Sequence, residues 1–558
     1  MSEIKKMWYK EMAVYQIWTR SFCDSNGDGI GDLPGVYSKL DYIKSLGVDG
    51  IWFSPIYPTP NADYGYDISD YKNINPEFGT LEDFKKILDG AHERGMRVFM
   101  DLVVNHTSDE HEWFKKGAES KDSPYHDYYF WREGKKGGKK PPNNWLSVFE
   151  GGAWEYNENL EEYYLHVFAK KQPDLNMDNP AVREEVKSII RFWLDMGVDG
   201  FREDVINFIS KDEGLPNGFP LPVATGVEHY KHGPHLEEYL REFREVQKQY
   251  DCYIVGEGPQ TSLKDAVNFC SEGEGQLLDT LISFDHMNAD CLMVDWVKLP
   301  FNLKKLKRTF DRWQNAMYGR GWNTLYIENH DHARIIDRYG SLEYHTQSGK
   351  MLASMYMLQC GTPFIYQGQE IGMTNINITS LKDYKDVMTF NNYRIFKALG
   401  FSEKQYCALS SKVNRENART PVQWKNDRNA GFTTADEAWF KINSNYTKIN
   451  VEDQENDENS LLNFYRKLIK FRKENEVAIY GDFKQHYKNS GDIFVYERNY
   501  EGRRLLCINS FTEKPVKFTA PKGFDLERGT LELQNYDVIN PGKNTFILKP
   551  YETRVYLF

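Results

Sequence analysis

The sequence predicts an α/β protein built on a (β/α)8 TIM barrel, with an inserted subdomain after the third strand and an antiparallel β-sandwich at the C-terminus. Short apolar segments alternate with amphipathic helical segments over most of the chain, as in repeated βα units. One motif recurs at equivalent places, and the length of 558 residues suits a barrel with attachments.

Eight apolar segments have the length and composition of buried parallel strands. Helical segments lie between them; the segment 80–94 begins on Thr80 with Asp83 three residues later, which is a helix-capping pattern. The motif Leu46–Ile51 recurs as Met196–Phe201, each time ending a helix and beginning a strand. The eight strands are expected at 14–22, 47–57, 96–104, 198–206, 252–257, 281–286, 323–329 and 361–367.

Two regions break this alternation. Residues 107–175 are polar and aromatic, and the pattern after the helix expected at 460–475 becomes all-β. We therefore predict three parts: a barrel carrying the active site, an inserted subdomain at its mouth and a β-sandwich, formed respectively by residues 1–106 with 176–480, 107–175, and 481–558.

The composition excludes several classes of function. A formal charge of −12 argues against binding the phosphate backbone of nucleic acid, which needs a basic surface. No stretch approaches the ~20 apolar residues of a membrane span, and the N-terminal segment lacks an apolar signal core. The seven cysteines are scattered and never spaced as CxxC, which is typical of a reduced chain. We expect a cytoplasmic protein, a monomer or weak homo-oligomer, without nucleic-acid or membrane partners.

Polar residues lie toward or just after the carboxyl ends of several predicted strands, where a parallel barrel places its catalytic groups. They are Asp101, His106, Arg202, Asp204, Glu257, His330 and Asp331. Each alone could be a helix cap, but together they gather carboxylates, an arginine and histidines on one rim. Glycoside cleavage needs such a set, because one carboxylate attacks the sugar and one carboxylic acid protonates the leaving oxygen.

These residues stand in motifs that resemble the conserved regions of the α-amylase-type glycoside hydrolase family. The motifs are Asp101-Leu-Val-Val-Asn105-His106, Gly200-Phe-Arg202-Glu-Asp204, Gly256-Glu257 and Asn329-His330-Asp331. Three others are similar to its oligo-1,6-glucosidase branch: Gln172-Pro-Asp-Leu-Asn176, Ala418-Arg419-Thr-Pro-Val-Gln-Trp424 and Gly431-Phe-Thr-Thr. The resemblance covers nearly the whole chain and implies a barrel, a domain inserted after the third strand and a C-terminal sandwich.

The resemblance also implies a role for each residue. Asp204 would be the nucleophile, Glu257 the general acid/base and Asp331 a stabiliser of the transition state. Arg202 precedes Asp204 by two residues, so strand alternation places both on one face, where the guanidinium favours the ionised carboxylate. The substrate-binding residues implied are Asp63, Tyr66, His106, Gln172, Arg202, His330 and Arg419. Among these, Tyr66 would stack beneath the first glucose, and Asp63 with Arg419 would close the pocket and make cleavage exo-acting.

The segment 24–32 places oxygen ligands on alternate residues, with Gly29 at the sharp turn. This is the first part of an EF-hand-type calcium loop, but Gly35 stands where the bidentate glutamate would be. The resemblance implies one structural Ca²⁺ held by Asp24, Asn26, Asp28, the carbonyl of Ile30, and Asp32. The alternative is an Asx-rich turn without metal. No organic cofactor is expected.

The sequence does not determine which leaving group the enzyme accepts. Val205 after the nucleophile resembles α-1,6-acting enzymes, but Gly258 and His332-Ala333 depart from the usual pattern on the expected aglycone side. Glu203 stands where an apolar residue is usual; it should face the helix layer, where its charge needs a partner.

The sequence therefore predicts a retaining, exo-acting α-glucosidase that releases glucose from the non-reducing end of short, α-1,6-linked oligosaccharides. The near alternatives are a trehalose-6-phosphate hydrolase and a sucrose isomerase or transglucosidase; the segment 285–300 lacks the arginine-rich patch of the isomerases. A remote alternative is a non-catalytic barrel relative, such as the heavy subunit of an amino-acid transporter. That class needs a membrane span and usually loses the carboxylates retained here.

Overall fold

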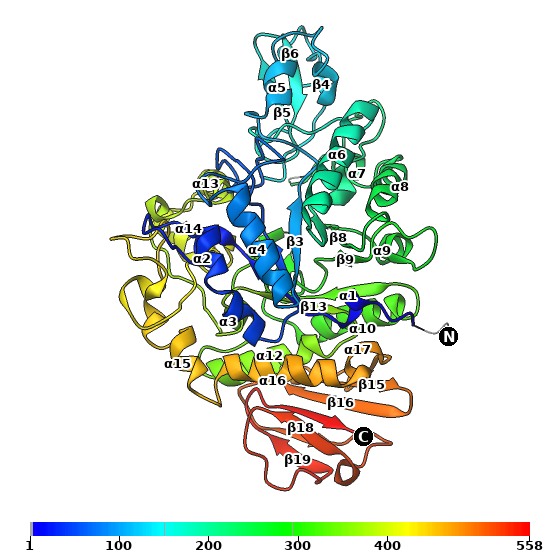
Figure 1. Cartoon of the computed structure of the whole chain (residues 1–558), viewed down its shortest axis with the longest axis vertical. Coiled ribbons are helices and arrows are strands. Elements are labelled where there is room, and N and C mark those ends of the chain that lie inside the picture. The colour runs from blue at the N-terminus through cyan, green and yellow to red at the C-terminus, as the bar shows by residue number, and fades with distance from the viewer. Residues whose placement is uncertain (1–3, 150, 222, 293) are drawn as a thin grey trace.

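In the computed structural model, eight parallel strands close into a barrel in the order β1-β13-β12-β9-β8-β7-β3-β2 (Figure 1). The structure describes residues 4–149, 151–221, 223–292 and 294–558. The predicted barrel is confirmed, and each strand overlaps one predicted segment. The strands are β1 (Val14–Ile17), β2 (Gly50–Phe53), β3 (Arg97–Leu102), β7 (Gly200–Glu203), β8 (Tyr253–Glu257), β9 (Thr280–Ile282), β12 (Trp322–Leu325) and β13 (Thr362–Tyr366).

The recurring motif makes the same connection twice. Gly47 and Gly197 both adopt positive φ, at 90° and 109°, where an L side chain would be strained. The aspartate two residues later then ties its strand to a neighbour: Asp49 Oδ2 accepts the N–H of Ala13 (3.0 Å), and Asp199 Oδ2 accepts that of Val98 (2.8 Å). The repeat therefore encodes a helix end and the register of the following strand.

Helices surround the barrel, and their ends follow local capping chemistry. Thr80 and Asp83 form a capping box at the start of α4 (Leu81–Glu93), as predicted, and Asn179 caps α6 (Pro180–Met196), whose first residue is proline. Other helices of this layer are α3 (Leu40–Ser45), α8 (Leu236–Gln247), α9 (Leu263–Cys270), α10 (Leu303–Met317), α12 (His345–Met357) and α16 (Leu461–Glu474). Among the described residues, no helix has the length and apolarity needed to cross a membrane.

A small antiparallel sheet lies between β3 and β7 in the chain, together with α5 (Glu112–Gly117). Its strands, in the order β4-β6-β5, are β4 (Trp131–Arg132), β5 (Trp154–Asn157) and β6 (Glu162–Leu165). In Figure 1, β3 points toward this sheet, so the sheet is at the carboxyl end of the barrel strands. Asp174, near the end of the inserted segment 107–175, forms a buried ion pair with Lys211 in the loop after β7; Lys211 Nζ lies 2.9 Å from Asp174 Oδ2.

The C-terminal sheets lie at the opposite end of the molecule (Figure 1). A five-stranded antiparallel sheet has the order β14-β15-β16-β20-β18, and β17 pairs with β19. Buried side chains of both sheets, among them Val495, Ile508, Phe518 and Leu548, share one apolar core. The bounds are β14 (Lys484–His486), β15 (Ile493–Tyr500), β16 (Arg503–Ser510), β17 (Val516–Thr519), β18 (Thr530–Gln534), β19 (Thr545–Leu548) and β20 (Thr553–Leu557).

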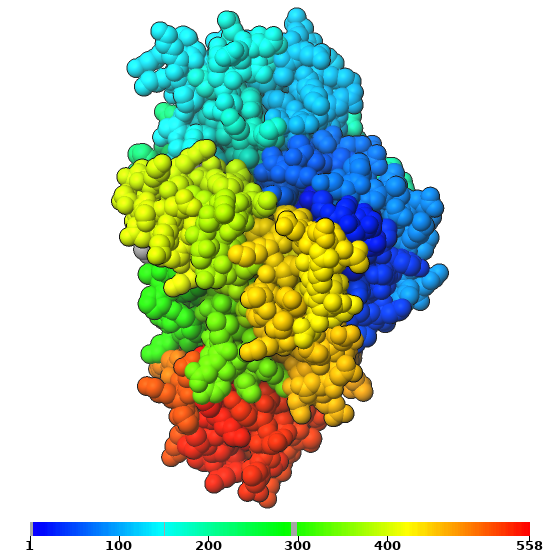
Figure 2. Space-filling view, turned by 90° about the vertical axis from the view of Figure 1, so that its left-hand side faces the viewer, coloured from blue at the N-terminus to red at the C-terminus, as the bar shows by residue number. Residues whose placement is uncertain are grey.

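Two further helices, α13 (Val387–Ala398) and α14 (Glu403–Ser410), follow the last barrel strand β13. The aromatic pair Phe396–Tyr406, with ring centroids 5.3 Å apart, packs one helix on the other. In the space-filling view this segment lies directly beneath the inserted subdomain (Figure 2). The two together flank the carboxyl end of the barrel.

Candidate active site

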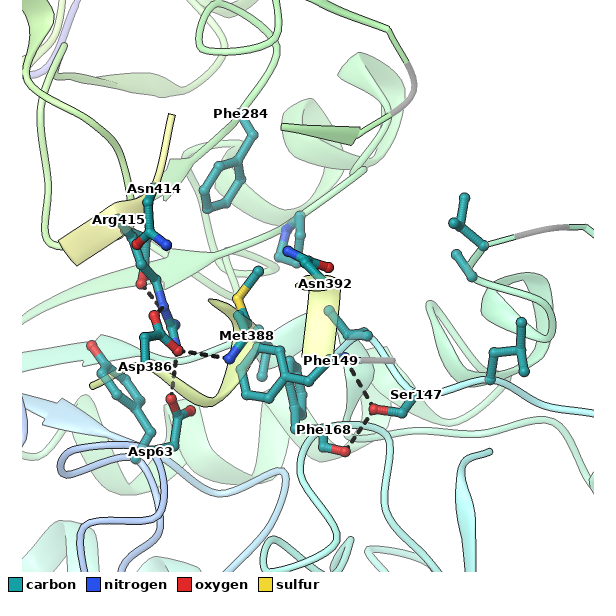
Figure 3. A pocket seen from close by; sticks show the side chains of 18 of the residues that line it. Asp63, Ser147, Phe149, Phe168, Phe284, Asp386, Met388, Asn392, Asn414 and Arg415 are labelled. Atoms are coloured by element: carbon teal, nitrogen blue, oxygen red, sulfur yellow. Dashed lines mark hydrogen bonds and ion pairs between the residues drawn. The ribbon is translucent and has the colours of Figure 1, made fainter. Parts of the chain in front are cut away.

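A cavity of ≈ 400 Å³ opens at the carboxyl end of the barrel, between the insert and the α13–α14 segment (Figure 3). Of the residues expected from the sequence, those lining it are Asp63, Tyr66, His106, Asp204, Glu257 and Asp331. Arg202, His330, Gln172 and Arg419 are buried beside these residues. The structure thus brings the predicted site residues together.

Arg202 lies at the centre of a buried carboxylate cluster. Its Nη1 is 2.6 Å from Asp101 Oδ1 and 2.6 Å from Asp204 Oδ1, and its Nη2 is 2.7 Å from Glu257 Oε2. The backbone supports this arrangement because Asp101 and Arg202 are paired in register between β3 and β7. One guanidinium therefore connects the predicted nucleophile to the predicted acid.

Three carboxylates around one guanidinium leave excess negative charge in a buried place. Burial raises the pKa of Asp204 well above its ordinary value; Arg202 opposes this, and Glu257 and Asp101 add to it. Burial likewise raises the pKa of Asp101 to about 6 against the influence of Arg202. Asp101 and Asp204 therefore titrate as an interacting set rather than as independent groups.

The backbone of Val205 also contacts the carboxyl group of Glu257. Its φ of 36° lies in the left-handed region, where a β-branched residue is strained. In that conformation its N–H donates to Glu257 Oε2 at 3.1 Å. Local strain next to Asp204 is therefore used to orient the carboxyl of Glu257.

A ring stack holds His330 beneath the cavity. Tyr66 and His330 stack with centroids 5.3 Å apart and an interplanar angle of 7°, and Tyr66 Oη lies 2.6 Å from His330 Nε2. Gln16 Nε2 is 2.8 Å from the other ring nitrogen, Nδ1. Burial lowers the pKa of His330, so its ring is neutral at pH 7 and suited to hydrogen bonding with hydroxyl groups.

Asp331 has the opposite electrostatic environment to Asp204. Burial raises its pKa, but His330, Arg415 and Arg419 outweigh burial and hold the pKa of Asp331 well below its usual range. Asp331 Oδ1 is 3.2 Å from Arg415 Nη1 and 3.1 Å from Arg419 Nη2. Asp331 is therefore a permanent anion at the cavity wall.

Asp63, Gln172 and His106 form a second polar group on the wall. Gln172 Nε2 donates to Asp63 Oδ2 at 3.2 Å and lies 3.1 Å from His106 Nε2. Burial lowers the pKa of His106 to about 4 and raises that of Asp63 to about 6, although Arg415 opposes the latter shift. Asp63 and His106 thus present polar atoms to the cavity, and Gln172 connects them.

Arg415, which was not predicted, is among the residues that line the cavity, whereas Arg419, predicted to bind substrate, is not. Arg415 lines the cavity, its Nη2 lies 2.8 Å from Asp63 Oδ1, and its Nε donates to Asp386. Figure 3 shows this Asp63–Arg415–Asp386 group. Arg419 is buried beside this group. Its Nη2 lies 3.1 Å from Asp331 Oδ1, and its Nε donates to the His330 carbonyl at 3.1 Å. The missed signal is a second arginine four residues before Arg419, in Arg415-Glu-Asn-Ala-Arg419.

The open questions at Glu203 and Gly258 have structural answers. Glu203 faces the helix layer as expected, where Gln247 of α8 donates to its Oε1 at 2.7 Å. Burial raises the pKa of Glu203 to about 7.

At Gly258 an added Cβ would be 2.5 Å from Thr261 Oγ1 and 2.9 Å from Leu281, so the space of a side chain is filled by these neighbours. His332 lines the cavity edge-on to Phe284, with centroids 5.7 Å apart.

The loop expected to bind calcium folds as consecutive Asx turns. Asp24 Oδ1 accepts the N–H of Asn26 (2.9 Å), Asn26 Oδ1 accepts that of Asp28 (2.9 Å), and Asp28 Oδ1 accepts that of Ile30 (2.8 Å). Asp32 caps α2 (Leu33–Tyr37) through the N–H of Gly35. Within the described ranges, no group of three or more His, Cys, Asp or Glu residues is gathered as a metal site.

Comparison with known proteins agrees with this geometry. The α-amylase catalytic-domain model matches residues 16–481. An oligo-1,6-glucosidase from Parageobacillus thermoglucosidasius is 46% identical over 561 residues, 99% of each chain, and a trehalose-6-phosphate hydrolase from Bacillus subtilis (strain 168) is 42% identical over 554 residues, 98% of each chain. The crystal structure of isomaltulose synthase from Klebsiella sp. LX3 superimposes with a TM-score of 0.96 at 38% identity, covering 99% of this chain and 100% of that one. The predicted resemblance is thereby confirmed, and the chain belongs to the α-amylase family of glycoside hydrolases.

Proposed function

We propose that the protein is a retaining, exo-acting α-glucosidase that releases glucose from short α-1,6-linked oligosaccharides. The observation that carries the proposal is the buried contact of Asp204 and Glu257 with one guanidinium at the base of the cavity. Retention needs the two carboxyl groups about 5 Å apart, too close for an intervening water. A guanidinium that bridges both carboxylates is compatible with that spacing.

In the proposed reaction, Asp204 attacks the anomeric carbon while Glu257 protonates the departing glycosidic oxygen. Glu257 then removes a proton from water, which displaces Asp204 and releases glucose with retained configuration. Asp331, whose pKa is held low, would remain ionised and stabilise the positive charge that develops on the sugar ring.

The exo mode is proposed from the wall formed by Asp63 and Arg415. Their 2.8 Å ion pair lies at the cavity with Asp386, and it presents charged atoms to the hydroxyl groups of a terminal glucose. Charged hydrogen bonds are stronger than neutral ones and reject a group that cannot satisfy them. A sugar chain continuing through this wall would leave the pair buried and unsatisfied.

The linkage is proposed from Val205 and from the relatives. The relative from Parageobacillus thermoglucosidasius is named an oligo-1,6-glucosidase, and that from Bacillus subtilis (strain 168) a trehalose-6-phosphate hydrolase. We expect initial rates to fall in the order isomaltose, maltose, sucrose, trehalose 6-phosphate. A higher rate on trehalose 6-phosphate than on isomaltose would identify the protein as a trehalose-6-phosphate hydrolase instead.

We also propose that the 24–32 loop binds one calcium ion. Its donors are hard oxygens, and Asp28, whose Oδ1 accepts the N–H of Ile30, retains lone pairs for a cation. Asp24 accepts from Asn26, Gly27, Gly29 and Thr433, so binding a cation would require it to give up some of these hydrogen bonds. The loop packs against Phe432, whose carbonyl accepts the Asp24 N–H at 3.0 Å, and none of residues 24–32 is among the described residues that line the cavity. A bound ion would therefore stabilise the loop and take no part in the reaction.

Removal of calcium is expected to lower the melting temperature by several degrees without loss of activity at 25 °C. The measurement is thermal unfolding with and without a chelator, followed by repletion with CaCl2. The Asp28→Ala variant is the matched control, since it should lose the calcium-dependent part of the melting temperature. Loss of activity on chelation with unchanged melting would contradict a structural role.

A further inference from the structure

On the side formed by α13 and α14, the active-site cavity is lined by several apolar side chains beside the polar Asn392, Ser410 and Asn414. On α13, Met388, Ile395 and Phe396 stand at positions i, i+7 and i+8, so they share one helical face, and that face lines the cavity. On α14 and the turn after it, Leu409 and Val413 are four residues apart and also line it. Figure 3 shows Met388 beside Phe149 and Asn392, next to the Asp63–Asp386–Arg415 group.

The opposite wall has the same character. Leu146, Val148 and Val227, from the insert and from the segment after β7, line the cavity there. Leu409 and Val148, which both line the cavity, are 46% and 44% exposed, which leaves apolar surface for a ligand to cover. Aliphatic walls provide no hydrogen bonds to a polyhydroxylated leaving group.

The small number of cationic side chains in the lining also favours an uncharged leaving group. Among the described residues that line it, Arg415 is the only lysine or arginine. That guanidinium already contacts Asp63, Asp331 and Asp386. A phosphorylated leaving group needs cations to bind its oxygens, and this lining offers none beyond the one that holds the first sugar.

We propose that this cavity selects α-glucosides with an apolar leaving group, and specifically those of unbranched primary alcohols. The inference rests on the proposed glucosidase function for the sugar itself. The bond cleaved is of the same kind as in an α-1,6 linkage, since both join the anomeric carbon to a primary alcohol oxygen. Water adds across that bond; Glu257 passes its proton to the departing oxygen, and the products are glucose and the free alcohol.

The test compares n-butyl and n-octyl α-D-glucoside below the micelle concentration. Their leaving alcohols are equally acidic, so chemistry at Glu257 is the same and only burial of the alkyl chain differs. Kcat/KM for the octyl compound is expected to be at least about tenfold higher, a modest share of what four buried methylenes can contribute. Equal values, within twofold, would overturn the proposal.

Variants locate the effect. The double variant Ile395→Ser with Leu409→Ser should reduce the octyl-to-butyl ratio of kcat/KM below threefold, and this ratio does not depend on how much overall activity the variant retains. Leu399→Ser is the matched control, because Leu399 ends the same helix segment, is 68% exposed and is not part of the lining. An unchanged ratio in the double variant would place the alkyl chain elsewhere and refute the assignment.

Binding separates this proposal from the proposed function. In the Asp204→Ala protein, calorimetry should give a dissociation constant for octyl α-glucoside at least tenfold below that for butyl α-glucoside, whether or not the parent turns over isomaltose. If the parent protein did not hydrolyse isomaltose but the variant still bound octyl α-glucoside more tightly than butyl α-glucoside, only the proposed oligosaccharide activity would be refuted. A tenfold preference for trehalose 6-phosphate over trehalose would contradict the apolar assignment.

Discussion

Replacement of Glu257 by glutamine is expected to abolish hydrolysis of isomaltose while sparing the first step on an activated aryl α-glucoside. Glutamine preserves the shape of the side chain but has no proton to give. An aryl leaving group departs without protonation, whereas the primary alcohol of isomaltose does not. The second step still lacks its base, so a covalent glucosyl-enzyme should accumulate and appear as a burst of aryl alcohol.

Azide provides the diagnostic rescue. It is a nucleophile that needs no base, so it should restore turnover of the aryl substrate and give α-glucosyl azide through double inversion. Asp204→Ala, in contrast, should lower kcat by several orders of magnitude on both substrates because no glycosyl-enzyme forms. A β-configured azide from the Glu257→Gln protein, or equal losses on both substrates without rescue, would show that another residue is the acid.

Arg415→Ala is expected to lower kcat/KM on isomaltose by about a hundredfold to a thousandfold. Removing one partner of a buried, hydrogen-bonded charge pair costs about 2–5 kcal/mol, and here Asp63, Asp331 and Asp386 would all lose it. The melting temperature should also fall, because the buried Asp63 would lose the arginine with which it forms its ion pair. Steady-state kinetics and calorimetric unfolding measure the two effects.

Arg415→Lys and Arg428→Ala complete this experiment. Lysine keeps the charge but not the fork that reaches several carboxylates, so an intermediate loss is expected. Arg428 pairs with Asp436 on the surface, where both side chains are exposed, and its removal should change neither property. Full activity in Arg415→Ala, with the loss transferred to Arg419→Ala, would restore the role first expected for Arg419.

The sequence alone determined the barrel and the identity of the residues on its rim. In a parallel barrel the carboxyl ends of all strands meet on one face, so Asp204 after one strand and Glu257 at the end of the next are neighbours. The Gly-Val-Asp-Gly repeat likewise specified its connections, because a positive φ and a strand-entry aspartate are local requirements. Local chemistry of this kind can be read residue by residue.

Tertiary structure decided which arginine meets the substrate cavity, what Glu203 contacts and what lines the mouth. Arg415 and Asp63 are separated by 352 residues, and nothing in the local pattern distinguishes Arg415 from Arg419 as the partner. The apolar faces of α13 and α14 read equally well as buried core until their position beside the cavity is known. Such features depend on how distant segments pack, and packing selects among side chains that sequence periodicity treats as equivalent.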